Sequence, residues 1–512
     1  MKRTVMLIIL DGWGLGPATG SNPIHVVGPK NFEWLAQNFP MTSLQASGIS
    51  VGLPWGEVGN SEVGHLTLGA GKVIYQYFPR ITMAIRDQSF FENPVLKNAF
   101  SHAKKNNSAV NIIGLLGSGT VHSSIEHLEA LLKMAERENV SNIKLHLFGD
   151  GRDSPPRTLE KLLEKIPQEK VATLAGRYYA MNRDQNWMLT ERTYGCLAAT
   201  SGQVVESIAE AKKVIENSYR QGLSEEFLLP LRIGANAIRD NDAVIFFNYR
   251  EDSMRQLSRA FISQNFDKFP VKKFKNLYIA TMTLYEETST AGAAFPPETV
   301  EQPLSRVLSE TGKTQLKIAE TFKYAHVTYF FNGYRDPPFE NEYRVLIPSL
   351  KIAHPDEQPE LMAGAITDRL LEAVQNQSFD FALANYSNPD VIAHTGNYNA
   401  CLETVRVIDA EIGRLIKTAL GTPTIILITS DHGNIEEVVN PQTGQPETQH
   451  DPSPVPFYLI GSEFKKRKFL NWQNIGVETI GIISDVAPTI LELMRIPKPK
   501  EMTGRSLLKN LL

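Results

Sequence analysis

The feature that most constrains this fold is the wide separation of seven side chains whose chemistry belongs together. Three carboxylates, three imidazoles and one serine hydroxyl fall into two groups, one within the first 61 residues and one from residue 390 onward. Such a set works only if both ends of the chain fold into one domain. The seven residues are Asp11, Ser61, Asp390, His394, Asp431, His432 and His450.

Apolar runs lead into several members of this set. Residues 5–10, 381–385 and 424–429 are predicted strands, and each ends at a member of the set or a few residues before one. Amphipathic stretches at residues 361–375 and 402–420 are predicted helices. Alternating strands and helices predict an α/β fold with largely parallel sheets, which bind ligands at the carboxyl ends of their strands.

The middle of the chain repeats this alternation with strands of its own, near residues 110–115, 143–148, 171–175, 243–247 and 277–282. The Gly-rich stretch 69–71 running into residues 75–77, and the stretch 286–297 with its Pro-Pro pair, are candidate boundaries. We therefore expect a discontinuous metal-binding domain of residues 1–76 and 298–512. Residues 77–297 are expected to form an inserted α/β domain that binds substrate.

Bulk composition excludes several classes of protein. A chain of 512 residues predicts two or more domains. The net charge of −4 gives no strong field for nucleic acid or a membrane surface, and the six-residue run 5–10 is too short for a signal segment or a membrane span. We expect a cytoplasmic protein. Cys196 and Cys401 show no pairing pattern, so any metal would be held by nitrogen and oxygen.

The local contexts of the histidines resemble parts of a metal site. Asp390 and His394 have the i, i+4 spacing that places two side chains on one helical face, after Asn388 as N-cap and Pro389 at the first helical position. Asp431-His432-Gly433 follows a strand, and His450 lies in a predicted loop. Each piece alone is more often an exposed pair, a turn or a surface histidine. Together they supply two three-residue sets for Zn²⁺ or Mn²⁺.

Ser61 lies in the segment Gly59-Asn60-Ser61-Glu62-Val63-Gly64-His65. The glycines permit sharp turns and the close approach of a phosphate, and a helix starting just after Ser61 would direct backbone N–H groups at a phosphate on that serine. On local evidence alone, a helix-capping serine is the commoner role. Beside two cations, Ser61 instead suggests phosphoryl transfer.

The predicted insert carries a different chemistry. Several basic side chains follow its strands, where guanidinium groups could bind a small di- or trianionic substrate bidentately. Taken singly, each arginine is more often a solvated surface residue. Lys323, which lies outside the insert, could bind the same anion. The candidates within the insert are His122, Arg152, Asp153, Arg177, Arg183 and Arg250.

At these residues the chain resembles the cofactor-independent (2,3-bisphosphoglycerate-independent) phosphoglycerate mutases, a family of the alkaline phosphatase superfamily. The resemblance spans nearly the full length. Several long motifs occur in order, so chance similarity is negligible. They lie at residues 10–14, 59–65, 150–153, 176–184, 323–328, 385–396, 430–434 and 485–489.

The resemblance implies an alkaline-phosphatase-like domain that interconverts 3-phosphoglycerate and 2-phosphoglycerate in glycolysis and gluconeogenesis. It implies two Mn²⁺ ions, Ser61 as the nucleophile and a monomeric enzyme. One ion would be held by Asp390, His394 and His450, the other by Asp11, Ser61, Asp431 and His432. Substrate would be bound by His122, Arg152, Asp153, Arg177, Arg183, Arg250 and Lys323, with Asp153 a candidate acid or base.

The chain departs from the family pattern at two positions. Ser253 stands where the family commonly has a second clamp arginine after Arg250, and Arg255 is a candidate replacement. Asn182 stands where an aspartate is common, which we expect to matter little. The first departure concerns affinity for the substrate phosphate more than the class of reaction.

Three other functions compete with the mutase. A metal-dependent phosphomonoesterase of the same superfamily would share the fold and the metal set, with water attacking the phosphoserine. A phosphopentomutase fits the anion-binding residues of the insert less well. A catalytically silent relative is disfavoured by the intact nucleophile and ligands. A mutase also needs a lid that excludes water from a phosphoserine, and the arginine-bearing insert could serve as one.

Overall fold

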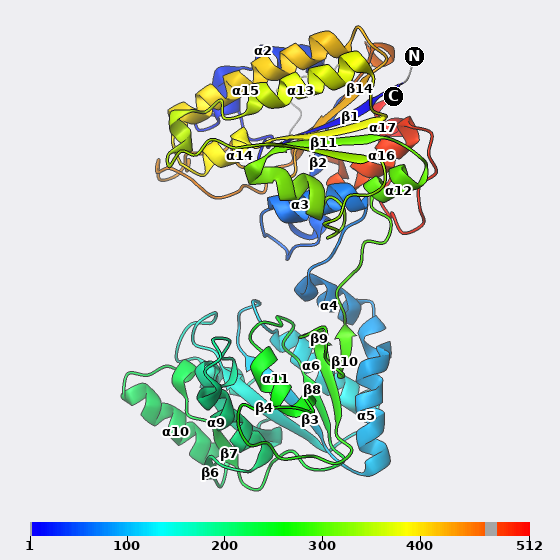
Figure 1. The fold of residues 1–512 in the computed structure, drawn as a ribbon. Helices are drawn as coiled ribbons and strands as arrows, with labels where there is room; N and C mark the ends of the chain where they lie inside the picture. Colours follow the sequence, from blue (N-terminus) through cyan, green and yellow to red (C-terminus); the bar gives the residue numbers. More distant parts are fainter. Residues whose placement is uncertain (1–2, 466–478) are drawn as a thin grey trace. The chain divides into compact units, whose positions relative to one another are not determined.

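The computed structural model describes residues 3–465 and 479–512, and the chain divides into two compact units (Figure 1). Unit 1 is Met1–Gln76 together with Glu298–Leu512, and unit 2 is Tyr77–Pro297. Each unit has its own sheet and its own hydrophobic core. The predicted fold class, an α/β domain interrupted by a second α/β domain, is confirmed.

In the described residues of unit 1, eight strands form one sheet in the order β12-β11-β13-β1-β14-β15-β2-β16. The first five are mutually parallel, whereas β15 runs antiparallel to both of its neighbours. The strands are β1 (Val5–Leu10), β2 (Met41–Gln45), β11 (Gln315–Glu320), β12 (Glu342–Ile347), β13 (Phe381–Tyr386), β14 (Ile425–Thr429), β15 (Val455–Ile460) and β16 (Thr479–Ile482).

Helices cover both faces of this sheet, as Figure 1 shows. α2 (Lys30–Asn38), α13 (Ala363–Asn376) and α15 (Tyr398–Ala419) lie on one face, and α3 (Ser61–Ala70), α12 (Leu304–Glu310) and α16 (Val486–Leu493) lie on the other. All six residues of β1 are buried. A strand covered on both faces has no solvent-facing side, so its sequence does not alternate between apolar and polar residues. This explains the uninterrupted apolar run at residues 5–10.

Unit 2 has a second sheet, in the order β10-β9-β8-β3-β4-β5-β7-β6. Only the β5–β7 pair is antiparallel. Its strands are β3 (Val110–Leu116), β4 (Ile143–Gly149), β5 (Val171–Gly176), β6 (Gln203–Val205), β7 (Leu231–Ile233), β8 (Ala243–Phe246), β9 (Tyr278–Thr283) and β10 (Gly292–Phe295).

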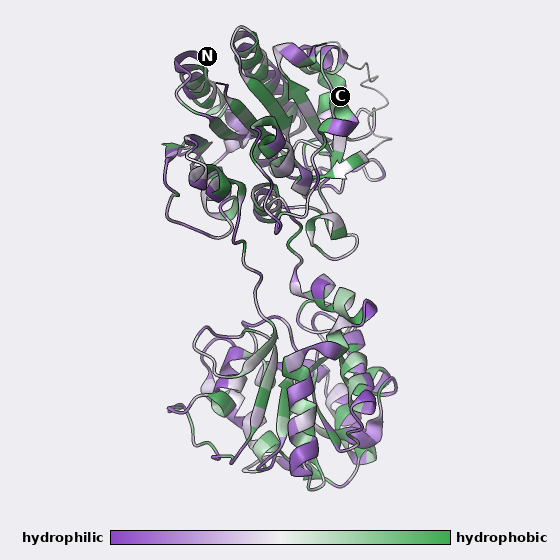
Figure 2. Ribbon diagram, turned by 90° about the vertical axis from the view of Figure 1, so that its right-hand side faces the viewer, coloured by the Kyte–Doolittle hydropathy of each residue, from purple (hydrophilic) through white to green (hydrophobic). Residues whose placement is uncertain are grey.

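Side chains alternate between the two faces of the unit 2 sheet. Val110 and Ile112 of β3 pack with α5 (Pro94–Asn106) and α6 (Ile125–Arg137), while Ile113 and Leu115 pack with α9 (Trp187–Ala198) and α11 (Arg255–Ile262). In Figure 2 the strands at the centre of each unit are coloured as hydrophobic. None of the helices in the described residues is long and apolar enough to cross a membrane.

The two units divide at the ends of the candidate boundary stretches, after Gln76 and after Pro297. The stretch 286–297 also contains β10, because Gly292–Phe295 pairs in register with β9. Gly69 and Ala70, at the start of the other stretch, lie inside α3. One local prediction was wrong. α14 (Asn388–Ala393) begins at Asn388, after Ser387, and the Asn388 side chain donates to the carbonyls of Pro359 and Glu360 instead of capping the helix.

Close packing of α3 makes Gly69 sensitive to substitution. A Cβ on Gly69 would lie 2.0 Å from the carbonyl oxygen of Phe331, which follows the π-helical turn η6 (His326–Phe330). Gly69→Ala should therefore lower the free energy of unfolding by about 1–3 kcal/mol, the cost of overpacking, although alanine is normally the better helix former. The measurement is the thermal unfolding midpoint.

Gly364→Ala in α13 is the matched control. A Cβ at Gly364 would meet only the Glu411 carboxylate, at 4.0 Å. The control should be neutral or slightly stabilising. Equal midpoints for the two variants would contradict the proposed clash.

Candidate metal centre

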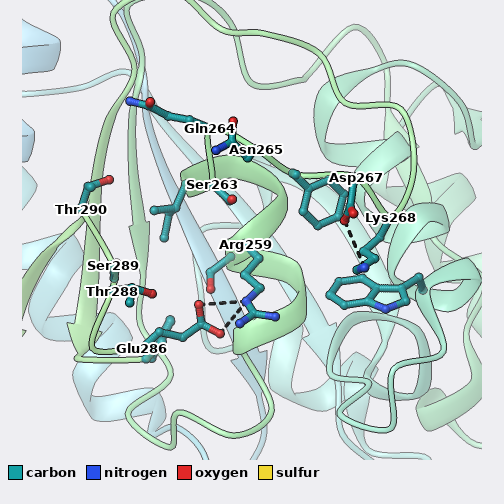
Figure 3. A pocket seen from close by; sticks show the side chains of 15 residues that line it. Arg259, Ser263, Gln264, Asn265, Asp267, Lys268, Glu286, Thr288, Ser289 and Thr290 are labelled. Atoms are coloured by element: carbon teal, nitrogen blue, oxygen red, sulfur yellow. Dashed lines mark hydrogen bonds and ion pairs between the residues drawn. The ribbon is translucent and has the colours of Figure 1, made fainter.

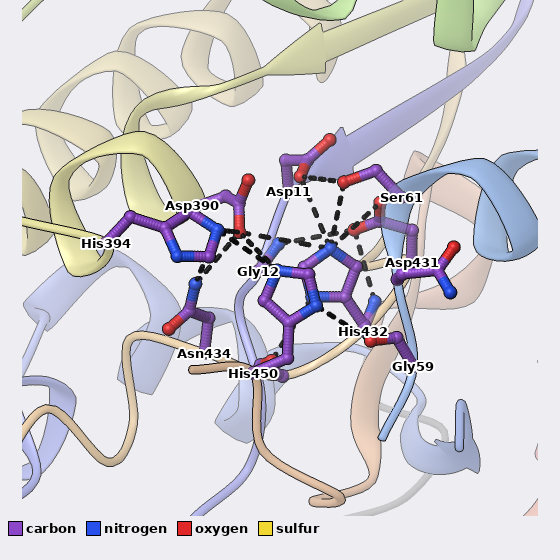
Figure 4. A network of polar contacts seen from close by, with 12 residues as sticks. Asp11, Gly12, Gly59, Ser61, Asp390, His394, Asp431, His432, Asn434 and His450 are labelled. Carbon is purple, nitrogen blue, oxygen red and sulfur yellow. Dashed lines mark hydrogen bonds and ion pairs between the residues drawn. The ribbon is translucent and has the colours of Figure 1, made fainter. Parts of the chain in front are cut away.

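The carboxyl ends of four adjacent parallel strands meet at one edge of the unit 1 sheet. Lys323 follows β11, Asp390 follows β13, Asp11 follows β1 and Asp431 follows β14. In Figure 4 the side chains of the three aspartates surround the His432 ring, and His394 lies on the outer side of Asp390. The sheet therefore gathers groups that are as far apart in sequence as residues 11 and 431.

Ser61 is the first residue of α3 and is not its cap. The cap is Asn60, whose side chain accepts a hydrogen bond from the backbone N–H of Val63 at 2.9 Å. This frees the Ser61 hydroxyl, whose Oγ lies 3.1 Å from Asp11 Oδ1, 3.0 Å from His432 Nε2 and 2.7 Å from Lys323 Nζ. The sequence suggests either that Ser61 caps a helix or that a helix begins just after it. In the structure Ser61 is instead the first helical residue, and its hydroxyl is directed at the cluster.

One group of acceptor atoms surrounds Asp390. Its Oδ1 lies 3.2 Å from Nε2 of His394 and 3.2 Å from Nε2 of His450, and these two nitrogens are 3.1 Å apart. The Nδ1 atom of each ring donates at 2.8 Å to a backbone carbonyl, from Thr448 and Gly59 respectively. In a neutral imidazole whose Nδ1 carries the proton, Nε2 presents a lone pair. Two nitrogen lone pairs and a carboxylate oxygen therefore converge.

A second group is formed by Asp11, Asp431 and His432, whose ligand atoms lie within 4.8 Å of one another. His432 Nδ1 faces its neighbouring carbonyl on Gly433 at 3.2 Å, which leaves Nε2 directed at Ser61. His432 also falls within 4.8 Å of the ligand atoms of Asp390 and His450, so it lies between the two groups.

The donor set fits divalent cations. Convergent lone pairs repel one another unless a proton or a cation lies between them, and carboxylate oxygen with imidazole nitrogen suits Zn²⁺ or Mn²⁺. The backbone carbonyls that accept from Nδ1 are the second layer of contacts that usually orients metal-binding histidines. The arrangement of all seven side chains thus indicates divalent-metal binding.

Lys323 supplies positive charge within the cluster. Its Nζ lies 2.6 Å from Asp11 Oδ1 and 2.7 Å from Asp390 Oδ2. Burial opposes a charge on each group, yet the Lys323 ammonium holds the pKa of Asp390 well below its usual range, and the carboxylates of Asp11 and Asp390 raise the pKa of Lys323. Lys323 is predicted as a substrate ligand; in the structure it contacts Ser61 and two of the aspartates.

Three polar residues that the sequence analysis did not assign hold these aspartates in place. Asn385 donates to Asp11 Oδ2 at 2.7 Å, and Asn434 donates to Asp390 Oδ1 at 2.9 Å. His65 Nδ1 lies 3.1 Å from Asp431 Oδ2. His65 follows Ser61 at i+4 on α3, the spacing already noted for Asp390 and His394, so this signal was available in the sequence.

Glu436 joins two of the loops that carry candidate ligands. Its Oε2 accepts from the backbone N–H of Gly14 at 2.8 Å and from that of Asn434 at 2.9 Å. A Cβ on Gly14 would lie 1.9 Å from Glu436 Oε1, and one on Gly433 would lie 2.1 Å from it. A side chain at either position would therefore displace the Glu436 carboxylate, which fixes the loop after β1 to the turn after β14.

In unit 2, four polar residues assemble at the ends of β3, β4 and β5. Arg177 Nη1 donates at 2.5 Å to Asp150 Oδ1 and to Asp153 Oδ2, and its Nη2 lies 3.0 Å from His122 Nε2. Burial and the Arg177 charge lower the pKa of His122 to about 4, so the imidazole is neutral. Its Nδ1 then donates to the Ser253 hydroxyl, at 3.1 Å.

A second basic cluster combines Arg250 and Asp252, which follow β8, with Arg183, which follows α8 (Arg177–Ala180). Asp252 Oδ2 is 2.8 Å from Arg183 Nη1 and 3.2 Å from Arg250 Nη2. The chain adds β4 and β5 on one side of β3 and β8 to β10 on the other, so the strand order reverses between β3 and β8. Ligands of open α/β sheets bind at such a reversal. Arg152 is exposed, and no side-chain partner of it is found in the described part of the chain.

Comparison with known proteins agrees with this division of the chain. A family model described as BPG-independent PGAM N-terminus matches residues 81–287, and a sulfatase model matches residues 327–496. The 2,3-bisphosphoglycerate-independent phosphoglycerate mutase of Clostridium botulinum (strain Langeland) is 41% identical over 521 residues, which cover 99% of this chain and 100% of the relative. The chain belongs to the family of 2,3-bisphosphoglycerate-independent phosphoglycerate mutases.

Other mutases of this family are similarly related. The protein of Francisella tularensis subsp. novicida is 41% identical, with 99% of both chains covered. A crystal structure of Leishmania mexicana phosphoglycerate mutase at low cobalt concentration is 25% identical and covers 99% of this chain and 97% of its own, with a TM-score of 0.53. The two family models together fit the alkaline phosphatase superfamily.

The buried Glu436 gives a prediction for stability against pH. Burial raises the pKa of Glu436 from 4.5 to about 8, so the folded protein holds a proton there that the unfolded chain has lost. The free energy of unfolding should therefore fall as pH rises from 4.5 to 8 and level off above that. Glu436→Gln removes this titration. From pH 5 to pH 8 the free energy of unfolding of the variant should therefore rise relative to that of the parent, by on the order of a few kcal/mol.

Unfolding midpoints of the parent and of Glu436→Gln, measured in a chelator at both pH values, check this. Glu403→Gln, on the exposed side of α15, is the control and should track the parent. A difference between Glu436→Gln and the parent that does not change with pH would show that Glu436 is ionised in the folded protein.

Proposed function

We propose that this enzyme is an isomerase that interconverts 3-phosphoglycerate and 2-phosphoglycerate without 2,3-bisphosphoglycerate, in glycolysis and gluconeogenesis. The observation that supports it most directly is the position of Ser61. Its hydroxyl contacts Asp11, His432 and Lys323 within the cluster of candidate ligands, in a chain related over its full length to mutases of that name. This arrangement suits a serine that accepts a phosphoryl group and passes it on.

We propose two divalent cations, Mn²⁺ in the first instance, as cofactors. Asp390, His394 and His450 would hold one, and Asp11, Ser61, Asp431 and His432 the other. When bound, the cations would lower the pKa of the serine hydroxyl and neutralise charge on the phosphoryl group. Support comes from the convergent lone pairs around Asp390 and from the three-residue set beside Ser61.

In this proposal Ser61 Oγ forms a bond to phosphorus as the bond between phosphorus and the C3 oxygen of the substrate breaks. The C2 hydroxyl of the same glycerate then attacks phosphorus, and the Ser61 bond breaks. In the first step the Ser61 hydroxyl loses a proton and the C3 oxygen gains one; in the second the C2 hydroxyl loses a proton and Ser61 regains one. Asp153 is the candidate acid or base for these transfers. Lys323 stays protonated and stabilises negative charge beside Ser61.

Unit 2 is proposed to bind the glycerate. His122, Arg152, Asp153, Arg177, Arg183 and Arg250 follow its strand ends, five of them in the two clusters described above, and guanidinium groups suit a substrate that carries both phosphate and carboxylate. Unit 1 is proposed to carry out phosphoryl transfer.

One assay tests this function. Metal-loaded protein is incubated with 3-phosphoglycerate in the absence of bisphosphoglycerate, and both 2-phosphoglycerate and free phosphate are measured. We expect 2-phosphoglycerate as the main product. Dominant release of phosphate would instead identify a phosphomonoesterase, and a lack of any turnover would indicate a silent relative.

Replacement of the nucleophile gives a sharper test. Ser61→Ala should reduce isomerisation by at least about 10³-fold, since no other hydroxyl occupies that position. The control is Thr67→Val on the same helix, whose buried hydroxyl has no hydrogen-bond partner in the described residues. Circular dichroism should show both variants folded. Turnover near the parent rate in Ser61→Ala would remove Ser61 from the mechanism.

Activity should also depend on pH at limiting metal. The hydrogen bond and charge of Asp390 raise the pKa of His394, and the same contact, opposed by burial, raises that of His450. Protons therefore compete with a cation for these nitrogens as pH falls, so we expect weaker metal binding and lower activity below about pH 6.5. Titration of the metal at pH 8 and pH 5.5 measures this. Equal affinities would exclude the histidines as ligands.

A further inference from the structure

Unit 2 contains an open cavity of about 830 Å³ beside the start of α11. Its lining includes Arg183 and Asp252, which belong to the second basic cluster, and also Arg255, the first residue of α11. A smaller cavity of about 360 Å³ adjoins it and shares Arg259, Lys268 and Glu286 (Figure 3). The cations around this space differ in how far their charge is already neutralised.

Most of the cations are paired with carboxylates. Arg259 Nε lies 2.6 Å from Glu286 Oε1, and Lys268 Nζ lies 3.1 Å from Asp267 Oδ1; both pairs are marked in Figure 3. Arg183 and Arg250 share one oxygen of Asp252. Burial opposes ionisation of Asp252, but the two arginines hold its pKa below the usual value. This trio therefore carries a net charge of about +1.

Arg255 has no such partner. Its Nε donates at 2.9 Å to the backbone carbonyl of Tyr285, a buried residue whose hydroxyl donates to the Asn248 carbonyl at 2.6 Å. Its two terminal amino groups face no carboxylate within salt-bridge distance in residues 3–465 and 479–512. The side chain is therefore anchored at one edge and keeps its bidentate edge free for a ligand.

The loop that carries Arg183 is fixed to the helix that begins at Arg255. Gln256 accepts from the backbone N–H of Gln185 at 2.7 Å and donates to the Thr190 hydroxyl at 3.0 Å. Asn182, whose side chain accepts from the N–H groups of Asp184 and Asn186, holds the turn at Arg183. The two guanidinium groups are thus positioned before any ligand arrives, which lowers the entropic cost of binding.

We propose that Arg255 completes an anion site with Arg183 and Arg250 and that this site binds the phosphate of phosphoglycerate. Three guanidinium groups and one carboxylate give a net charge of about +2, which matches a phosphomonoester dianion. Ser253 cannot serve here, because it is buried against His122. The assignment rests on the proposed function and specifies which side chains of unit 2 recognise the phosphoryl end of the substrate.

Full-length, metal-loaded enzyme tests the proposal through the split between KM and kcat. Arg255→Ala should raise KM for 3-phosphoglycerate by about tenfold or more, with a smaller change in kcat, because a bidentate contact to a charged phosphate is lost. Arg255→Lys should restore part of the affinity. Arg259→Ala, one helical turn further on and already paired with Glu286, should stay within about threefold of the parent. An unchanged KM in Arg255→Ala overturns the proposal.

Inhibition distinguishes phosphate from carboxylate recognition. Glycerate, which lacks the phosphate, should inhibit Arg255→Ala and the parent equally, whereas inorganic phosphate should inhibit the variant more weakly. Loss of glycerate inhibition equal to the loss for 3-phosphoglycerate would assign Arg255 to the carboxylate and overturn the phosphate site.

Binding measured without turnover separates this proposal from the function itself. Calorimetric titration of 3-phosphoglycerate into Ser61→Ala and into Ser61→Ala/Arg255→Ala should show the same tenfold or greater difference. If the parent has no isomerase activity but the two variants still differ in affinity, the proposed function is rejected and the anion site is kept. If the parent is active but the two variants bind equally well, the anion site is rejected and the proposed function is kept.

Discussion

Parallel pairing of β11, β13, β1 and β14 is the constraint on which the rest of unit 1 depends. Strands that run in one direction place all their carboxyl ends at one edge, so residues that follow each strand become neighbours whatever their separation in sequence. Asp11, Asp390, Asp431 and Lys323 follow the four strands in this way. Antiparallel pairing would have divided the same residues between opposite edges of the sheet.

The gathering of buried acids creates an electrostatic problem that the protein solves with neutral donors and one lysine. Burial and the neighbouring Asp431 raise the pKa of Asp11, whereas Asp390, beside Lys323, stays strongly acidic. Asn385 and Asn434 donate to these carboxylates without adding charge. The cluster therefore still has many carboxylate oxygens and imidazole nitrogens that can accept, as expected of residues that bind cations.

Much of this arrangement was predictable from strand endings and spacing. The apolar run at residues 5–10 became β1, and the seven separated side chains lie together in unit 1. The supporting contacts were not predictable in the same way. Glu436 touches Gly14 only because two loops fold against each other, and a carboxylate in a loop gives no sign of burial. The capping role of Asn60 was hidden because Ser61 is an equally good capping residue.

The central position of β1 has a consequence for synthesis of the chain. Its six buried residues lie near the amino terminus, whereas both of its neighbours in the sheet, β13 and β14, begin at Phe381 and Ile425. A ribosome adding roughly 5–20 residues per second needs about 20–75 s to reach β13, so β1 stays unpaired for that time. Unit 2, whose core is contiguous in sequence, can fold meanwhile. The apolar segment 5–10 is therefore a part of the nascent chain that can associate with other chains until β13 and β14 have been made.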